Sequence, residues 1–493
     1  MTGHPATDDV TPPAKILVPG DNCWRVERAS SMSVIVDAAE YFDVARWAML
    51  GARKRIMLIG WDFDVRIRFG KDSAEGEPEK LGDFILWLVK RRPELHIYLL
   101  RWDMGALKTL LRGSTFVTLI KWMRQPNIHI RLDSTHPVGS SHHQKIVVID
   151  DCFAFCGGID LTGDRWDTRA HRDDEPGRRQ PNGKPYGPWH DATTALEGPI
   201  AAALGTLARE RWRSSGGKSL EAVEARTRCW PKTLGVQFTN VDVAISRSMP
   251  SLPNRTEVYE IERLYLDIIA NARSYIYAEN QYFTSRRIAE AIARRLAEAD
   301  PPEFVLINPF SAEGWLQSVA MDTARARLYE ALRRRDEHRC FRIYHPCTSA
   351  GQPIYVHAKI LISDDRLLRV GSSNLNNRSL RLDTECDVTI DAALAPDAGA
   401  RAMIAAIRDG LIAEHLGADA DKVARRIDAA GSIITAIEAL RGDGRSLRPY
   451  QIPDLTDVEQ WVADHEVLDP ETPEEMFEPV AKRGLFRRLR RRR

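Results

Sequence analysis

The stretch HQKIVVID at residues 143–150 recurs in form as HAKILISD at residues 357–364. Both octads have the pattern H-x-K-x-x-x-x-D, and residues after them also match at the same offset of 214 positions. The matched pairs are Gly157 and Gly371, Asp160 and Asn374, and Leu161 and Leu375. One octad can arise by chance, but two octads with their tails in register indicate an internal duplication.

The segments that precede the two octads correspond as well. ARKRI at 52–56 leads into MLIGWDFD, and ARSYI at 272–276 leads into YAENQYF. Each pair reads as a helix end followed by an apolar strand that stops at polar residues. Helical periodicity at 284–299 precedes the strand-like EFVLINPF, and GDFILWLVKRRPELHIYLLRWD repeats that order in the first half. Such alternation predicts an α/β fold of two homologous lobes related by a pseudo-two-fold axis, with largely parallel, buried strands.

The duplication divides the chain into two lobes with short flanking segments. A stretch rich in proline, glycine and charge at 173–188 predicts a long loop within the first lobe. Helical periodicity returns at 420–441. We therefore expect a flexible N-terminus at 1–14, a first lobe at 15–225, a second lobe at 226–418, and a helical C-terminal extension with a basic tail at 419–493.

The composition is that of an ordinary soluble globular chain. Of its 493 residues, 43% are hydrophobic and 28% are charged, and the formal net charge is +1. This near-neutrality gives no global attraction to nucleic acid, so polyanion binding would depend on local patches. The first residues do not resemble a secretory signal, and no long apolar stretch is present. We expect a cytoplasmic protein or one peripheral to a membrane, with export by another route left open.

The seven cysteines are odd in number and scattered, so no disulfide framework is expected. This usage weakly favours a reducing compartment. Cys152 and Cys156 lie in DCFAFCGG, where no second Cys/His pair completes a zinc site. We interpret both as buried strand residues.

The octads carry the chemistry. Residues i and i+2 of a strand share a face, so His143 lies beside Lys145, and His357 lies beside Lys359. Two such pairs in one cleft suit a phosphodiester, because lysines neutralise the phosphoryl oxygens while one histidine attacks phosphorus and the other protonates the leaving alcohol. The lysines supply the positive charge, so we expect no metal and no cofactor. The residues alone do not say which histidine attacks.

Other residues near the octads have less certain roles. Asp150 and Asp364 complete the motif and are grouped with the catalytic residues. Each also closes an apolar strand where a turn is expected, and that structural role is our favoured interpretation. His142 should point away from His143. Four tryptophans close to predicted strand ends should form core or cleft wall: Trp61, Trp102, Trp166 and Trp189.

These motifs resemble those of the phospholipase D superfamily, and most closely its bacterial members of eukaryotic type. The resemblance rests on both octads, on GGIDL and GSSNLNNRS after them, and on YAENQYF, RWD and PWHD. It implies a single-chain bilobal fold with the active site between the lobes, and a covalent phosphohistidine. By this resemblance His143 is the nucleophile and His357 the general acid, while Lys145, Lys359 and Asn374 hold the phosphate.

The resemblance also implies an acid that orients each histidine. Glu385 in DTECDV and Asp191 in PWHD fit this role, although the sequence does not say which half each acid serves. Asp160 occupies the place of Asn374 in the first half. As a phosphate ligand it is less favourable, because a carboxylate repels a phosphate unless it is protonated or paired.

Four functions stay open at this point. The first is a phospholipase D that cleaves the distal phosphodiester of a phosphatidylcholine-like lipid, with transphosphatidylation to alcohols. The others are a cardiolipin synthase-type phosphatidyl transferase, a nuclease or other phosphodiesterase, and a non-catalytic scaffold. We expect a monomer that meets phospholipid at a membrane surface and has no nucleic-acid partner. The basic tail KRGLFRRLRRRR at 482–493 is either a peripheral membrane contact or a solvated terminus.

Overall fold

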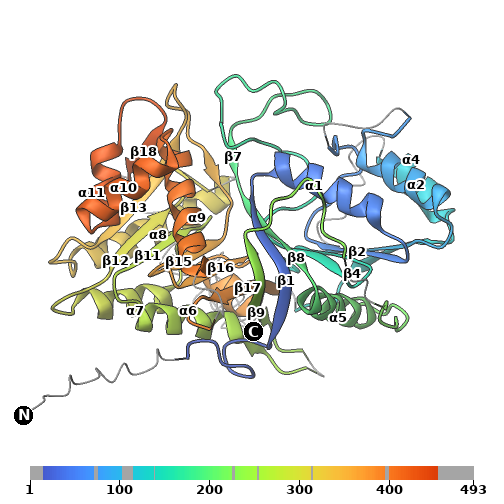
Figure 1. The fold of residues 1–493 in the computed structure, drawn as a ribbon, viewed down its shortest axis with the longest axis horizontal. Helices are drawn as coiled ribbons and strands as arrows, with labels where there is room; N and C mark the ends of the chain where they lie inside the picture. Colours follow the sequence, from blue (N-terminus) through green and yellow to red (C-terminus); the bar gives the residue numbers. More distant parts are fainter. Residues whose placement is uncertain are drawn as a thin grey trace, which may run out of the picture.

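Two lobes lie side by side in the computed structural model, joined through β1 and β9 at the centre (Figure 1). The structure describes residues 15–70, 76–102, 115–137, 139–224, 228–252, 255–312, 315–394 and 399–452. The expected flexible N-terminus and the basic tail lie outside these residues. A 16-stranded sheet runs through both lobes.

The first lobe alternates strands and helices in the expected order. Its strands are β1 (Arg25–Val36), β2 (Arg55–Gly60), β3 (His96–Trp102), β4 (Ile128–Asp133), β5 (Ile146–Ile149), β6 (Phe153–Gly157), β7 (Trp189–His190) and β8 (Ala192–Glu197). Its helices are α1 (Ala38–Gly51), α2 (Leu81–Arg91), α4 (Thr115–Met123) and α5 (Pro199–Ser214).

The second lobe repeats that order and then adds elements. Its strands are β9 (Phe238–Met249), β10 (Val258–Tyr259), β11 (Tyr275–Glu279), β12 (Glu303–Ile307), β13 (Phe341–Cys347), β14 (Tyr355–Val356), β15 (Ile360–Ser363), β16 (Leu367–Gly371), β17 (Glu385–Asp391) and β18 (Ser446–Pro449). Its helices are α6 (Glu260–Asn271), α7 (Arg286–Leu296), α8 (Trp315–Arg333), the π-helical turn η1 (Arg378–Leu382), α9 (Gly399–Leu416), α10 (Ala420–Ala430) and α11 (Ile433–Leu440).

The strand order reads almost the same from either end, which confirms two homologous lobes. It is β18-β13-β12-β11-β15-β16-β17-β9-β1-β8-β6-β5-β2-β3-β4. The prediction of largely parallel strands is wrong for most of the sheet. Only β2-β3-β4 and β11-β12-β13 pair in parallel within it, and the other pairings are antiparallel. The reason is that the octad strands β5 and β15 return through tight hairpins into β6 and β16.

Each hairpin turns at a pair of aspartates with positive φ. Asp150 and Asp151 have φ of 48° and 50°, and Asp364 and Asp365 have 55° and 50°. Each pair lies in a three-residue loop, because Ile149 pairs with Phe153 and Ser363 pairs with Leu367, and aspartate tolerates this backbone region better than most side chains.

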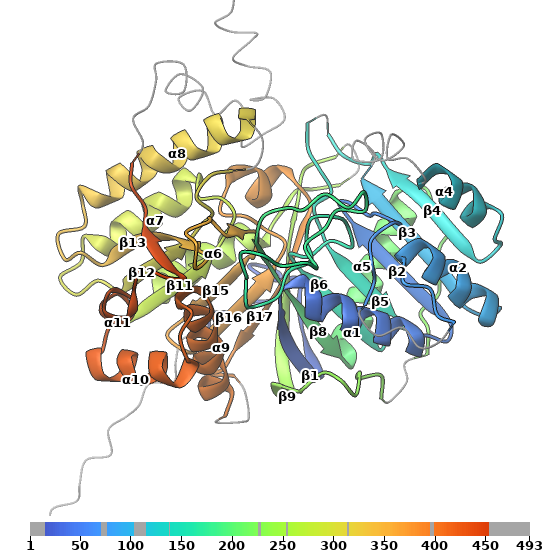
Figure 2. The ribbon, with the colours of Figure 1, turned by 90° about the horizontal axis from the view of Figure 1, so that it is seen from above.

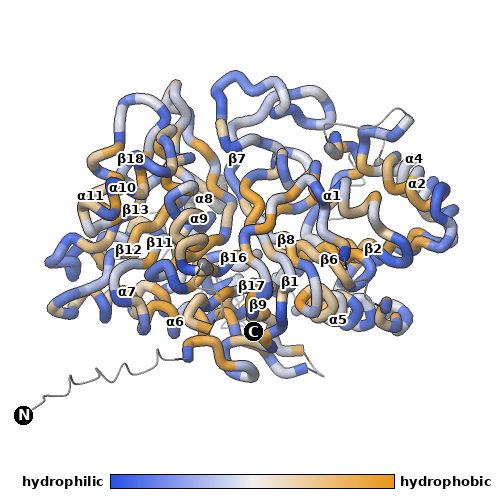
Figure 3. Tube along the Cα trace, in the orientation of Figure 1, coloured by the Kyte–Doolittle hydropathy of each residue, from blue (hydrophilic) through white to orange (hydrophobic). Residues whose placement is uncertain are grey.

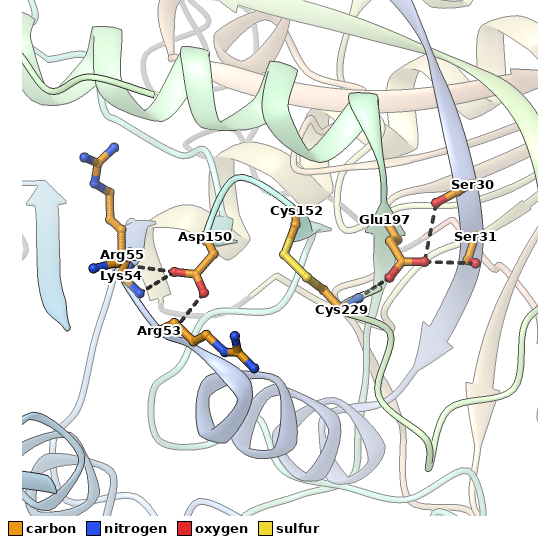
Figure 4. Close-up of a disulfide and its surroundings, with 9 residues drawn as sticks. All are labelled: Ser30, Ser31, Arg53, Lys54, Arg55, Asp150, Cys152, Glu197 and Cys229. Carbon is orange, nitrogen blue, oxygen red and sulfur yellow. Dashed lines mark hydrogen bonds between the residues drawn. A yellow bond between two sulfur atoms is a disulfide. The ribbon is translucent and has the colours of Figure 1, made fainter. Parts of the chain in front are cut away.

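The carboxylates of Asp150 and Asp364 bind backbone rather than substrate. Asp150 accepts hydrogen bonds from the amides of residues 53–55 at 2.7–2.8 Å, as Figure 4 shows, and Asp364 accepts from those of residues 273–275 at 2.8–2.9 Å. Both aspartates therefore fix the start of a neighbouring strand at the end of the octad opposite to its histidine. These contacts support the structural interpretation of both residues.

Helices cover both faces of the sheet (Figure 2). Alternate residues of β5 belong to different cores: Ile146 and Val148 join the cluster that contains α5 and α9, whereas Val147 and Ile149 join the one that contains α1 and α2. Helices α6 and α7 form the equivalent core in the second lobe. In Figure 3 hydrophobic residues concentrate on strands such as β2, β6 and β8, while the long loop before β7 is largely hydrophilic.

A disulfide joins Cys152 to Cys229, which corrects the expectation of no disulfide. Cys152 lies in the turn after β5 rather than in a strand, whereas Cys156 is buried in β6 as predicted. The two bonded residues are 77 positions apart, so their spacing carried no motif. Nearby, Glu197 accepts hydrogen bonds from the amide of Cys229 and the hydroxyl of Ser31 (Figure 4).

The chain beyond residue 419 packs onto the second lobe as far as it is described. Helices α10 and α11 contact α9, and β18 pairs antiparallel with β13. Within the described ranges, no helix is both long enough and apolar enough to cross a membrane.

Candidate active site

The segments before the two octad histidines cross between the lobes. β14, directly before His357, pairs in parallel with β7, directly before Asp191. On the other side of the pseudo-dyad, a bridge joins His142 to Thr384, the residues before His143 and Glu385. This exchange brings the acid of each lobe against the histidine of the opposite lobe.

Each histidine therefore bonds the acid from the other half of the chain. His143 Nδ1 lies 2.9 Å from Glu385 Oε1, and His357 Nδ1 lies 2.7 Å from Asp191 Oδ2. Both carboxylates are fully buried, whereas the side chains of His143 and His357 are 14% and 7% exposed. The acids fix each imidazole through Nδ1, which leaves Nε2 for a substrate.

Small and hydroxylic residues shape the pockets of the two acids. Glu385 accepts hydrogen bonds from the hydroxyls of Ser372 and Ser379 at 2.5 and 2.7 Å. In the other half Gly158 occupies the place of Ser372, and a Cβ there would lie 2.2 Å from Asp191 Oδ1. The first half has glycine where the second half has serine because the carboxylates of Asp191 and Glu385 are placed differently.

The lysines lie beside their histidines as predicted. Lys145 Nζ donates to the carbonyl of His143 at 2.9 Å, and Lys359 Nζ donates to the carbonyl of His357. Lys145 also pairs with Asp160 at 3.2 Å. This ion pair balances the charge of Asp160, which is the condition under which a carboxylate can lie beside a phosphate.

In the second half of the chain, the side-chain amide of Gln281 lies beside the lysine, where the first half has the carboxylate of Asp160. Gln281 Oε1 lies 3.3 Å from Lys359 Nζ and 3.5 Å from Asn374 Nδ2. Sequence reasoning noted the YAENQYF stretch but did not single out Gln281. The matching position in the first half is a different residue, so the repeat gave no signal for it.

Burial and nearby positive charges both lower the pKa values of the two octad histidines. Burial, and then the charges of Lys145 and Lys359, lower the pKa of His143 well below its usual value. Burial, Lys359 and Arg165 do the same for the pKa of His357. Burial also lowers the pKa of Lys359 to about 7. The substrate-free site therefore favours neutral imidazoles.

Aromatic rings frame both histidines. Trp61 meets the ring of His143 edge-on with centroids 6.1 Å apart, and it stacks on Trp102 at 5.9 Å. Trp189 lies 5.2 Å from the ring of His357, and Arg165 lies over Trp189 at 4.2 Å. Sequence reasoning did not single out Arg165, although it belongs to the quoted RWD.

Two residues that were considered for the site from the sequence, His142 and Trp166, make structural contacts. His142 bonds the hydroxyl of Thr384 at 3.0 Å and faces Asp133 at 3.3 Å, so it helps to hold the exchanged segment. Trp166 packs against Gly177, where a Cβ would lie 2.1 Å from the indole ring.

Two family models match this chain. The family described as Phospholipase D matches residues 48–293, and the family described as Cardiolipin synthase, PLD-like domain, matches residues 265–401. The chain belongs to the phospholipase D superfamily. Membership of this superfamily indicates a phosphodiesterase or a phosphatidyl transferase.

Curated relatives are distant in sequence. Phospholipase D alpha 1 of Carica papaya is 24% identical over 75% of this chain and 63% of its own length, and phospholipase D A of Dictyostelium discoideum is 24% identical over 71% and 32%. The chain thus spans less than two thirds of the length of these relatives. Among solved structures, phosphatidylserine synthase of Haemophilus influenzae shares the fold, with a TM-score of 0.52 and 14% identity over 78% of this chain and 87% of that chain.

Proposed function

We propose that this superfamily member is a phospholipase D. It hydrolyses the distal phosphodiester of a phosphatidylcholine-like glycerophospholipid to phosphatidic acid and the head-group alcohol. The observation that carries the proposal is the exchange of acids between the lobes. It gives two histidines with buried carboxylates on Nδ1, and a lysine beside each of them.

In the first half-reaction, neutral His143 attacks phosphorus through Nε2, while its Nδ1 keeps its proton and donates it in a hydrogen bond to Glu385. The bond from phosphorus to the leaving alcohol breaks, and His357 Nε2 gives that oxygen its proton. His357 is neutral in the substrate-free site, so it takes up a proton when the anionic substrate adds its negative charge beside Asp191. Lys145, Lys359 and Asn374 hold the phosphoryl oxygens as charge builds up.

In the second half-reaction, His357 is neutral and acts as a base. It takes a proton from water, the water oxygen attacks phosphorus, and the bond to His143 breaks to release phosphatidic acid. A primary alcohol in place of water gives a phosphatidyl alcohol by the same steps. The balance of hydrolysis and transfer then depends on which acceptor reaches the site.

A product assay tests the proposal. The full chain is incubated with liposomes of phosphatidylcholine, phosphatidylethanolamine and phosphatidylglycerol, in EDTA with a little ethanol. We expect phosphatidic acid and phosphatidylethanol from the wild type and none from His143→Ala or His357→Ala. His338→Ala, which removes an exposed histidine of the second lobe, is the control and should keep full activity.

Three other outcomes would contradict the proposal. Cardiolipin as the main product would make the chain a phosphatidyl transferase, in line with the family that matches residues 265–401. Cleavage of nucleic acid without lipid turnover would make it a nuclease. Equal lipid turnover by the wild type and both histidine variants would remove the two-histidine mechanism.

A further inference from the structure

A second cluster of ionisable side chains lies directly behind Asp191. It contains Asp37, His171 and His190 of the first lobe and Glu414 of α9, and none of the four is more than 6% exposed. One donor atom from each lies within 4.8 Å of the others. The mechanism above uses none of these four side chains.

The donor atoms have the spacing of ligands around one small ion. Glu414 Oε1 hydrogen-bonds His171 Nε2 at 3.0 Å and lies 2.9 Å from His190 Nδ1. Asp37 lies 3.5 Å from His171 Nε2 through Oδ2 and 3.3 Å from His190 Nδ1 through Oδ1. Ligands at about 2.0–2.1 Å from a tetrahedral ion are separated by about 3.3 Å, which falls within this range.

Each of the four side chains uses its other polar atom to contact a separate partner. His171 Nδ1 bonds Asp167 at 2.9 Å, and His190 Nε2 bonds Glu279 at 2.7 Å. Histidines that bind metal ions almost always place their second nitrogen on such an oxygen, which fixes the tautomer.

The two carboxylates follow the same rule. Asp37 Oδ1 accepts the amide of Asp191 at 3.1 Å, and the second oxygen of Glu414 accepts from Arg169. In His171, His190 and Glu414 one atom is therefore held from outside while another faces the common centre, whereas both oxygens of Asp37 face the cluster and Oδ1 also accepts the amide of Asp191.

Two of these buried atoms lie beside charged partners but make no hydrogen bond, which leaves room for a ligand between them. Asp37 Oδ2 and His190 Nδ1 are both buried without a hydrogen bond. Asp37 also has φ 69° and ψ 149°, a backbone region that is costly for any residue with a side chain. Such strain persists only where surrounding contacts over-determine it, and a bound ion is a contact of that kind.

We propose that Asp37, His171, His190 and Glu414 bind one divalent transition-metal ion, with Zn²⁺ as the best fit. Two imidazoles and two carboxylates make a four-coordinate nitrogen and oxygen set that suits Zn²⁺, whereas Ca²⁺ needs six to eight oxygen ligands. The two carboxylates balance the charge of the ion, so the buried centre is neutral.

The ion would link the two lobes beside Asp191 and His357, where their relative position determines the geometry of the proposed active site. Three ligands come from the first lobe and Glu414 from the second. Asp37 also bonds both the amide and the carbonyl of Asp191, and the carbonyl of His190 accepts the amide of His357. The four ligands are thus positioning residues for the pair formed by Asp191 and His357. They do not touch the reacting phosphate.

Metal analysis of the purified full chain tests the proposal. We expect one zinc per chain after expression in zinc-supplemented medium. X-ray absorption should show nitrogen and oxygen ligands at about 2.0–2.1 Å, including imidazole. No zinc as purified and none after dialysis against zinc would overturn the proposal, because protons on the histidines would then hold the cluster together. Sulfur ligands at about 2.3 Å would overturn it as well, by assigning the zinc to cysteines.

Variants locate the ion. His171→Gln and Glu414→Gln should lose the zinc, whereas His415→Gln should keep it, because the Nε2 of this equally buried histidine bonds Glu279 rather than facing the four ligands. Zinc retained in the first two variants would overturn the proposal, and zinc lost only in His415→Gln would move the site to His190, Glu279 and His415. If the variants do not fold, the absorption spectrum of the wild type decides.

The result is separable from the proposed lipid chemistry. His143→Ala should keep its zinc while losing activity, and a wild type without lipid activity can still contain zinc. Because the four ligands are buried, a brief assay in EDTA tests only for a metal that solvent can reach.

Discussion

Asp191 and Glu385 each contact the imidazole of the opposite lobe, so the two acids affect different steps of the proposed reaction. Glu385 acts through His143, the proposed nucleophile, and Asp191 acts through His357, the proposed acid and base. The sequence suggested both acids but left the pairing open. The pairing depends on the short contacts of β7 with β14 and of His142 with Thr384, which local sequence patterns do not encode.

Leaving-group dependence separates the two acids. Asp191→Asn should slow the first turnover of phosphatidylcholine by about 10²–10⁴-fold, because the alkoxide leaving group needs a proton from His357. First-turnover release of nitrophenol from a p-nitrophenyl phosphodiester should fall much less, because nitrophenolate leaves unprotonated. Glu385→Gln should slow both substrates. The reverse pattern, measured by rapid quench, would exchange the roles of the two histidines.

We expect the charge on Lys359 to set the alkaline limit of the proposed activity. Its pKa is lowered to about 7 by burial, so the free enzyme loses this charge as the pH rises through 7. We expect kcat/KM to fall above that pH, because the phosphate of the substrate then loses a positively charged partner. The effect should appear in kcat/KM because this parameter reports the ionisations of the free enzyme. Lys359→Arg keeps its charge and should flatten the alkaline limb, even if the maximum is lower. An unchanged limb in this variant would assign it to another group.

At the scale of elements, periodicity and turn chemistry predicted much of the architecture. The helix expected at 284–299 is α7, and the strand after it is β12. Repeated octads predicted β5 and β15, and the aspartates after them predicted turns. Two features could not be predicted from the sequence because they depend on partners that are distant along the chain. The hairpins make neighbouring strands antiparallel, but they leave the hydrophobic pattern of the sequence the same as for parallel strands. Cys229 meets Cys152 only in the folded chain.

The disulfide should stabilise the first lobe without contributing to catalysis. Replacing Cys152 and Cys229 together by serine should lower the free energy of unfolding by about 2–4 kcal/mol, because the bond closes a loop of 77 positions. Neither cysteine contacts the octad histidines, so kcat should stay within about twofold by the usual tolerance of distant sites. Denaturant unfolding with and without dithiothreitol measures the effect. Reductant should destabilise the wild type to the level of the variant and leave the variant unchanged.

At the scale of the whole molecule, the lobes share a sheet, a core and the candidate active site. β1 of the first lobe pairs with β9 of the second, and one hydrophobic cluster includes both Leu204 of α5 and Leu411 of α9. Each octad histidine also bonds an acid of the other lobe. Neither half of the duplication therefore has a complete site, and misalignment of the lobes would affect both histidines together.

This shared construction predicts that the lobes unfold together. Ten of the twelve tryptophans precede residue 231, so tryptophan fluorescence reports mainly the first lobe, whereas far-UV circular dichroism reports both. Leu264→Ala removes a fully buried side chain from the second-lobe core on α6 and should cost about 2–5 kcal/mol. We expect the fluorescence and dichroism transitions to shift equally and to coincide. Leu88→Ala in the first-lobe core is the matched control and should shift both probes in the same way. If Leu264→Ala moves the dichroism transition while the fluorescence midpoint stays in place, the lobes unfold independently, and the β1–β9 pairing does not couple them.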